Sequence, residues 1–262
     1  LLVAVIIILI FRLTPAYTSQ IAESDTIQKS VKTPVEKAEK KEKNSELKML
    51  SDSVLQLPDP AFDSEVSVEY ALANRRSQRN FTNKALSSRE ISQILWAAYG
   101  VTKPYEKPAF LRGGLKTAPS AGGRYPLEIY LLAGNINDIP TGLYQYIPAG
   151  HQLKKLHNRD VRSELAEAAL NQLMLQEAPA GIVYTAIFER NTSKYGDRGR
   201  ERYVPMDVGH TAQNVYLQAT AMGLGTCAVG AFYDDKVAEV LELPDEEEPL
   251  MLMPLGYYKG KE

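Results

Sequence analysis

Residues 207–232 read DVGHTAQNVYLQATAMGLGTCAVGAF, and they combine a helical pattern, a glycine stop and an apolar run. The apolar residues that recur at helical spacing are Val208, Ala212, Val215, Ala219 and Met222. This spacing predicts a helix with one buried face that ends at Gly223. Because the residues after the glycine are also apolar, we expect this stretch to build part of a domain core.

Further helices and strands are expected to alternate on both sides of this stretch. Ser87 and Glu90 form a capping-box pattern, which predicts a helix that runs to Gly100. The other helices are expected over residues 67–77, from Asp160 through Leu170, and from Asp234 and Asp235 onward. Strands are expected over 127–134, 142–147 and 180–188, with apolar runs at 226–232 and 249–258. The alternation predicts an α+β or α/β domain with one central sheet.

The composition excludes several classes of protein. The chain has 262 residues, of which 44% are hydrophobic and 24% charged, as in soluble proteins with one domain or two small ones. A formal net charge of -2 gives no electrostatic footprint for nucleic acid. The single cysteine, Cys227, excludes an internal disulfide, and His151, His157 and His210 show no metal-ligand spacing. We therefore predict no structural zinc.

The N-terminal part differs in composition from the rest of the chain. Residues 1–11 are the apolar run LLVAVIIILIF, so we assign 1–19 to a signal peptide or membrane anchor, with a buried strand as the alternative. Residues 20–54 are rich in Lys and Glu, which predicts a charged, disordered linker. The folded domain is expected over 55–262. It would then be exported or anchored outside the cytoplasm, and an anchor facing the cytoplasm is the alternative.

The glycine-rich segment in the C-terminal half has a simple structural interpretation. GLGTCA (223–228) matches the G-x-G-x-x-A pattern of dinucleotide sites, but it follows a helix instead of a strand, which argues against a Rossmann site. A helix stop with close backbone packing explains it, although Gly225 and Gly230 could also expose backbone to a flat ligand. Cys227 is expected to be a core residue.

Three polar motifs allow both a structural and a functional interpretation. RRSQRNF (75–81) offers guanidinium and hydroxyl donors that suit a phosphate, but cations also favour helix C-termini. TAPSAGGRYP (117–126) is neither a P-loop nor a nucleophile elbow, so Ser120 is expected to be structural. SKYGDRGRERY (193–203) lies between two apolar stretches, either as a solvated loop or with a chemical role.

Taken in order, RRSQRNF, APSAGGRYPLEIY, DVGHTAQN and GLGTCAVGAF resemble the successive motifs of the flavin-dependent nitroreductase superfamily over about residues 65–258. KYGDRGRERY and the AGGRYP loop resemble its SagB-type branch of thiazole/oxazole-forming dehydrogenases. The resemblance implies an α+β nitroreductase-like fold with a mostly antiparallel central sheet flanked by helices. It also implies an interlocked homodimer that binds FMN between its subunits.

The resemblance assigns FMN contacts to three segments. They are Arg75, Arg76, Ser77 and Arg79, then Pro119, Ser120, Ala121 and Gly122, and finally Val229 and Gly230. The first set would contact the phosphate, ribityl chain and pyrimidine edge, the second would reach the partner's flavin, and the third would face N5, where hydride is exchanged. Lys259 or Lys261 could add phosphate contacts. Asp207 and His210 would order the following helix and its dimer contacts.

The resemblance also implies that Lys194 and Tyr195 are the catalytic residues. Oxidation of an azoline ring requires loss of a Cα proton together with hydride transfer, so a base is needed on the substrate side. The resemblance therefore implies an FMN-dependent oxidoreductase that acts on a small molecule or a modified peptide. Two alternatives are an NAD(P)H-dependent nitro or quinone reductase and a non-catalytic, membrane-tethered flavin-binding protein.

Overall fold

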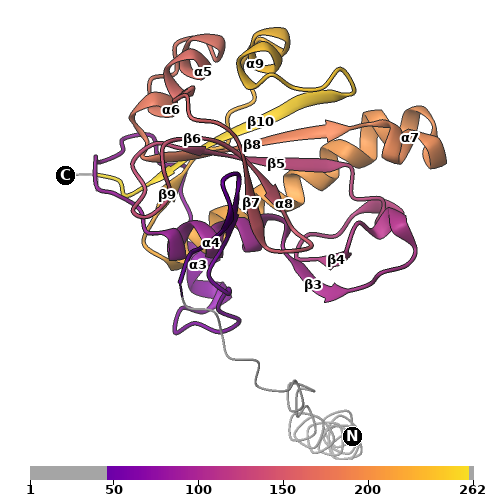
Figure 1. The fold of residues 1–262 in the computed structure, drawn as a ribbon, viewed down its shortest axis with the longest axis horizontal. Coiled ribbons are helices and arrows are strands. Elements are labelled where there is room, and N and C mark those ends of the chain that lie inside the picture. Colours follow the sequence, from indigo (N-terminus) through magenta and orange to yellow (C-terminus); the bar gives the residue numbers. More distant parts are fainter. Residues whose placement is uncertain (1–45, 260–262) are drawn as a thin grey trace, which may run out of the picture. The chain divides into compact units, whose positions relative to one another are not determined.

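The computed structural model describes residues 46–259, which form an antiparallel sheet with helices on both faces (Figure 1). In sheet order, the eight strands are β1 (Lys48–Ser51), β2 (Val54–Gln56), β7 (Gln152–His157), β6 (Gly142–Ile147), β5 (Leu127–Ala133), β8 (Ala180–Ile187), β10 (Glu247–Gly256) and β9 (Gly225–Thr226). A separate hairpin pairs β3 (Val101–Pro104) with β4 (Gly114–Lys116). This architecture confirms the predicted α+β class.

The helices divide between the two faces of the sheet. They are α3 (Val68–Asn74), α4 (Ser88–Tyr99), α5 (Arg162–Ala168), α6 (Met174–Glu177), α7 (Glu189–Tyr195), α8 (Val204–Ala221) and α9 (Asp234–Leu241). Two short 3-10 turns, Ala109–Leu111 and Ala121–Gly123, and a π-helical turn, Gly199–Tyr203, lie between them. α4 and α8 pack on one face, whereas α5 and α9 pack on the other (Figure 1).

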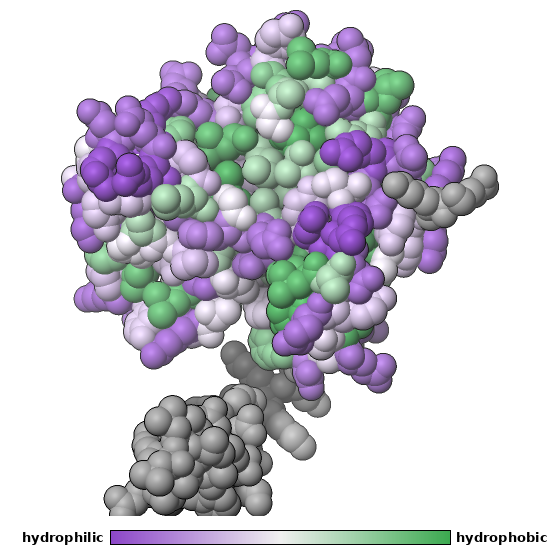
Figure 2. All heavy atoms as spheres, turned by 180° about the vertical axis from the view of Figure 1, so that it is seen from behind, coloured by the Kyte–Doolittle hydropathy of each residue, from purple (hydrophilic) through white to green (hydrophobic). Residues whose placement is uncertain are grey.

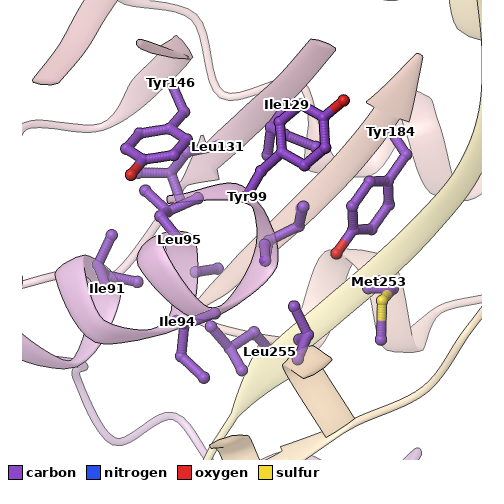
Figure 3. Close-up of a cluster of buried hydrophobic side chains, with 14 of the residues drawn as sticks. Ile91, Ile94, Leu95, Tyr99, Ile129, Leu131, Tyr146, Tyr184, Met253 and Leu255 are labelled. Atoms are coloured by element: carbon purple, nitrogen blue, oxygen red, sulfur yellow. The ribbon is translucent and has the colours of Figure 1, made fainter. Parts of the chain in front are cut away.

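Two hydrophobic cores result from the alternation of side chains along the central strands. In β5, Ile129 and Leu131 face α4 and α8, whereas Tyr130 and Leu132 face α5 and α9. Figure 3 shows the first core, where residues of α4 such as Leu95 meet side chains of β5, β6, β8 and β10. Because β5 and β8 are covered on both sides, they read as nearly continuous apolar runs.

Most of the predicted elements are confirmed. In the capping box of α4, Ser87 Oγ accepts from the Glu90 N–H (3.2 Å) and Glu90 Oε2 accepts from the Ser87 N–H (2.6 Å). The predicted strands at 127–134, 142–147 and 180–188 correspond to β5, β6 and β8. α8 buries its predicted face but begins at Val204, before the first residue of the apolar pattern.

Three sequence expectations need correction. α3 forms as predicted, but it buries only Ala71, and Val68 and Leu72 of its apolar stripe are exposed. α5 spans Arg162–Ala168 and stops before Leu170, whose backbone φ is +58°. The polar stretch 193–203 is not a loop, because it forms the end of α7 and the π-helical turn.

The first strands lie near the start of the described residues. The sequence predicted a disordered linker over residues 20–54, but β1 lies entirely within this range and β2 begins in it. Because β1 pairs with β2 and β2 pairs with β7, the sheet includes residues before the predicted domain start at 55. The predicted signal peptide or anchor at 1–19 lies outside the described residues. Within 46–259, no helix is long and apolar enough to cross a membrane.

Candidate active site

The arginine-rich segment after α3 runs beside β9. Ser77 forms a parallel bridge with Thr226, and the Gln78 N–H donates to the Thr226 carbonyl (2.9 Å). Within residues 46–259, no carboxylate forms an ion pair with the predicted anion-binding arginines, which are Arg75, Arg76 and Arg79. We call these three residues the arginine cluster. Their guanidinium groups can therefore bind an external anion without breaking an internal ion pair.

Tyr216 joins the arginine cluster to the glycine-rich segment after α8. Its Oη lies 3.0 Å from Ser77 Oγ and accepts a hydrogen bond from the Ala228 N–H (2.7 Å). The Arg75 guanidinium carbon lies 5.0 Å from the centre of the same ring. Tyr216 was not predicted as a site residue, because its contacts reach residues far away in the sequence.

The segment 225–230 leaves backbone open on one side. Both backbone polar groups of Val229 bond Leu252, and its side chain is buried in the second core. Ala228 and Gly230 are exposed, and a Cβ added at Gly230 would meet no atom within 4 Å. A Cβ at Gly225 would instead lie 2.7 Å from Gln78 Cβ, so glycine is needed there for packing. The open backbone can therefore accept a flat ligand beside the arginine cluster.

The C-terminal end of the described chain also reaches this region. The Lys259 N–H donates to the carbonyl of Asn80 (2.9 Å), which follows Arg79 directly. The exposed Lys259 side chain can thus add a positive charge near the cluster. Lys261, the other predicted phosphate contact, lies outside the described residues.

The loop 117–126 packs against the start of α8. Ser120 Oγ donates to Asp207 Oδ2 (2.5 Å) and accepts from the Tyr125 N–H (3.0 Å). Burial raises the pKa of the Asp207 carboxyl, although the hydrogen bonds from Ser120 and the Ala121 backbone act in the opposite direction. Asp207 therefore orders the loop and the helix start, whereas the nearby His210 is exposed.

Lys194 and Tyr195 meet the same loop at Gly122. A Cβ added at Gly122 would overlap Tyr195 Oη and lie 2.9 Å from Lys194 Nζ, so the ends of both side chains rest against the loop backbone. The Tyr195 ring also packs edge-on against Tyr203, with ring centres 4.8 Å apart. The structure therefore brings together two segments that the sequence analysis assigned to FMN binding and to catalysis.

A pocket of about 270 Å³ opens beside this contact. Its lining residues are Pro119, Ser120, Ala121, Tyr203, Met206, Asp207 and His210. Tyr203, which packs on Tyr195, also lines the pocket, so the predicted catalytic tyrosine is one ring away from it. The pocket can hold a small ring with an ionisable group on one side.

The site thus has two parts, at different positions along α8. Tyr216 belongs to the part with the arginine cluster, and Asp207 belongs to the part with the 117–126 loop. These residues are nine positions apart, which corresponds to about 13 Å along a helix. In one chain, the two parts therefore form separate binding surfaces.

Comparison with known proteins identifies this arrangement. Residues 72–257 match the Nitroreductase family. The chain is also 47% identical over 202 residues to a protein of Methanocaldococcus jannaschii that is described as a nitroreductase, covering 77% of this chain and 95% of that protein. The chain belongs to the nitroreductase family. It is therefore an FMN-dependent oxidoreductase, as the sequence resemblance implied, and the arginine cluster and open glycine backbone fit this cofactor.

Two solved structures extend the family comparison. A structure described as a nitroreductase from Ralstonia eutropha has a TM-score of 0.68 and 30% identity, covering 81% of this chain and 93% of that chain. The E. coli microcin synthetase McbBCD complex, solved with truncated pro-MccB17 bound, has a TM-score of 0.59 and 26% identity, covering 77% of each chain. The nitroreductase-like fold is thus shared with a member of a peptide-bound assembly.

Proposed function

We propose that this nitroreductase-family protein is a dehydrogenase of azoline-type rings, carried by small molecules or modified peptides, as in the SagB-type branch. The observation that carries the proposal is the contact of Lys194 Nζ and Tyr195 Oη with Gly122, which directly follows the pocket-lining residue Ala121. The likeness to a chain of the microcin synthetase complex, solved with a pro-peptide bound, supports a modified-peptide substrate.

We further propose that two chains form a homodimer that combines the two parts of the site. The arginine cluster of one subunit would bind FMN, and the 117–126 loop of the other subunit would cover it. The apolar side chains that α3 leaves exposed, Val68, Tyr70 and Leu72, support an interface that covers this helix. Figure 2 shows hydrophobic residues that reach the surface between charged ones on one face of the domain.

The residues near Tyr216 have binding roles in this proposal. The arginine cluster would hold the FMN phosphate through charge-assisted hydrogen bonds, and Ser77 would stay oriented by its contact with Tyr216. Ala228 and Gly230 would let the ring system approach the backbone closely. When bound, FMN supplies the acceptor for the hydride that leaves the substrate.

The residues at α7 have the proton-transfer role. Conversion of an azoline to an azole removes one hydride and one proton from the ring, which becomes aromatic. Tyr195, acting as the phenolate, would accept the Cα proton and become the neutral phenol, and the Lys194 ammonium would provide a positive charge 5.1 Å from the centre of the tyrosine ring. The apolar contacts from Tyr203 and Met206 would keep water away from the substrate ring.

Anaerobic mixing of FMN-loaded protein with a thiazoline- or oxazoline-containing peptide tests this function. We expect the flavin absorbance to bleach in proportion to the azole that forms. No bleaching by azolines, together with rapid bleaching by NAD(P)H and turnover of nitroaromatics, would instead support the reductase alternative. Retention of FMN with no reduction by any of these donors would indicate a non-catalytic flavin-binding protein.

The proposed location of the domain has its own test. Residues 1–19 are proposed to export or anchor the protein, with the residues between them and β1 as the connection. Cells that express the chain with and without residues 1–19 can be fractionated. Deletion of residues 1–19 should move the protein from the membrane or exported fraction to the soluble cell fraction. The same distribution for both forms would contradict this assignment.

A further inference from the structure

We propose that Arg124 is a positioning residue that clamps α7 to the 117–126 loop and thereby places Lys194 and Tyr195 against Gly122, beside the pocket. This inference rests on the proposed catalytic role of that pair. It concerns a residue of the AGGRYP motif that contacts neither the pocket nor the arginine cluster in the structure.

The clamp consists of two hydrogen bonds from one guanidinium group. Arg124 Nε donates to the carbonyl of Arg190 (2.7 Å), and Nη2 donates to Ser193 Oγ (3.0 Å). Ser193 immediately precedes Lys194, and Arg190 lies one helical turn before it. The fixed fork of the guanidinium therefore holds the turn of α7 that leads into the catalytic pair.

The backbone of the loop directs Arg124 toward α7. Gly122 and Gly123 have φ values of +61° and +66°, which glycine adopts without strain, and Arg124 returns to the right-handed region. The same turn places Gly122 against Tyr195 Oη. One short motif therefore both contacts the catalytic side chain and grips the helix that carries it.

A second set of contacts holds the start of α7. Arg190 Nη1 donates to the Pro126 carbonyl (3.3 Å) and lies 2.7 Å from Glu128 Oε1. The same carboxylate oxygen pairs with Arg112 Nη2 (2.5 Å). Because the Glu128 side chain is buried, removal of one partner from this network should endanger folding. Arg124, which is only partly buried, is the better residue to test.

These polar contacts matter because α7 has no apolar face that fixes its position. The helix has seven residues, and its only buried residue is Asn191. The side-chain oxygen and nitrogen of Asn191 have no hydrogen-bond partner within the described part of the chain, so they add no further attachment. Isolated helices shorter than about 12 residues are only marginally stable, so the placement of α7 depends on its attachments.

The substitution Arg124→Met removes both hydrogen bonds while keeping an unbranched apolar stem. We expect FMN affinity and KM to stay close to wild type, while kcat for azoline oxidation falls by about 10- to 100-fold, because the proton acceptor is misplaced. Arg124→Lys keeps the positive charge but loses the forked guanidinium, so its kcat should lie between those of wild type and Arg124→Met. Arg202→Met is the matched control, since Arg202 is exposed in the neighbouring π-helical turn.

A triple variant, compared with the double variant from which it is made, separates positioning from a direct role. If Arg124 acts only through the pair, Arg124→Met should cause no further loss of kcat in a protein that already carries Tyr195→Phe and Lys194→Ala. Independent losses that multiply would contradict the positioning role. Unchanged kcat in the single variant Arg124→Met would contradict it as well.

Hydrogen exchange gives a readout that needs no turnover. In the FMN-loaded protein, Arg124→Met should raise amide exchange in residues 189–195 by about tenfold or more, with the central strands unchanged. Unchanged exchange in α7 would overturn the clamp, even for an active enzyme. If wild type does not oxidise azolines but Arg124→Met still raises amide exchange in α7, the proposed substrate is wrong and the role of Arg124 in holding α7 is supported.

Discussion

The cations at the two ends of the site differ in what they contact. Around Tyr216, the arginine cluster has no ion-pair partner among residues 46–259. Around α7, Arg112, Arg124 and Arg190 all make internal contacts to carbonyls, a hydroxyl or Glu128. The first group is therefore available to a ligand, whereas the second group holds the protein together.

This difference supports different proposed roles for the two groups of arginines. Arg76 donates to the carbonyls of Ala73 and Arg75, but among residues 46–259 no carboxylate forms an ion pair with the arginine cluster. An external phosphate can therefore form charge-assisted hydrogen bonds with these guanidinium groups, and such contacts are stronger than neutral hydrogen bonds. A guanidinium that already bonds two backbone or side-chain oxygens has less to offer a ligand, but it fixes the segments that it joins. The contrast supports our proposal that one end of the site binds FMN and the other end places the proton acceptor.

The largest effect that can sharpen this comparison is expected at Tyr195. Tyr195→Phe removes the hydroxyl at Gly122 but keeps the ring that packs on Tyr203. We expect kcat for azoline oxidation to fall by about 100- to 10,000-fold, with FMN affinity unchanged. Stopped-flow bleaching of the flavin measures the step directly. An unchanged bleaching rate would remove Tyr195 from proton transfer.

A smaller effect is expected at Tyr216. Tyr216→Phe deletes the hydroxyl that contacts Ser77 and accepts from the Ala228 N–H, but it keeps the ring beneath Arg75. Loss of these hydrogen bonds should weaken FMN binding by roughly tenfold without unfolding the domain. Fluorescence titration of FMN measures the change, with the exposed Tyr233→Phe as control. Equal affinity in both variants would show that Tyr216 does not organise the FMN site.

The smallest effect is expected at Lys116, which contacts Arg112 at the α7 end of the site. It concerns the pH dependence of the free energy of unfolding. Lys116 Nζ donates to the carbonyls of Leu111 (3.2 Å), Arg112 (3.2 Å) and Gly114 (3.4 Å). Burial, with a smaller contribution from Arg112, lowers the pKa of Lys116 from its ordinary 10.5 to about 8. The unfolded chain then binds more protons than the folded chain between these values, so the free energy of unfolding should rise with pH across that window.

Lys116→Met should remove this contribution to the pH dependence. Urea unfolding of the apo domain, followed at several pH values between about 8 and 10.5, compares the two slopes. We expect the rise in wild type to exceed that in the variant. If the free energy of unfolding changed with pH equally in both proteins, the pKa of Lys116 would not be lowered in the folded state.

The sequence predicted those parts of the fold that depend on local patterns. The capping box at Ser87 and Glu90 and the apolar periodicity of 208–222 report on contacts within one helix, so both were confirmed. The continuous apolar runs of β5 and β8 follow from burial on both faces. The exposure of Val68 and Leu72 could not be inferred in this way, because their apolar spacing does not say which surface covers them.

The missed site residues depend on contacts between distant segments. Ser77 and Tyr216 are 139 positions apart, and Arg124 reaches Arg190 across 66 positions. No periodic pattern or local motif records such pairs. The helical form of 193–203 was missed for a related reason, because its charged residues give no apolar face and its position depends on contacts from the 117–126 loop.

The most direct test of this division of roles is a side-by-side FMN titration of wild type, Arg75→Ala/Arg79→Ala and Arg124→Met. We expect the double variant to stay folded but to bind FMN at least about 100-fold more weakly, because two charge-assisted contacts are lost. Arg124→Met should bind FMN like wild type. Full FMN affinity in the double variant, or an equal loss in both variants, would contradict the account.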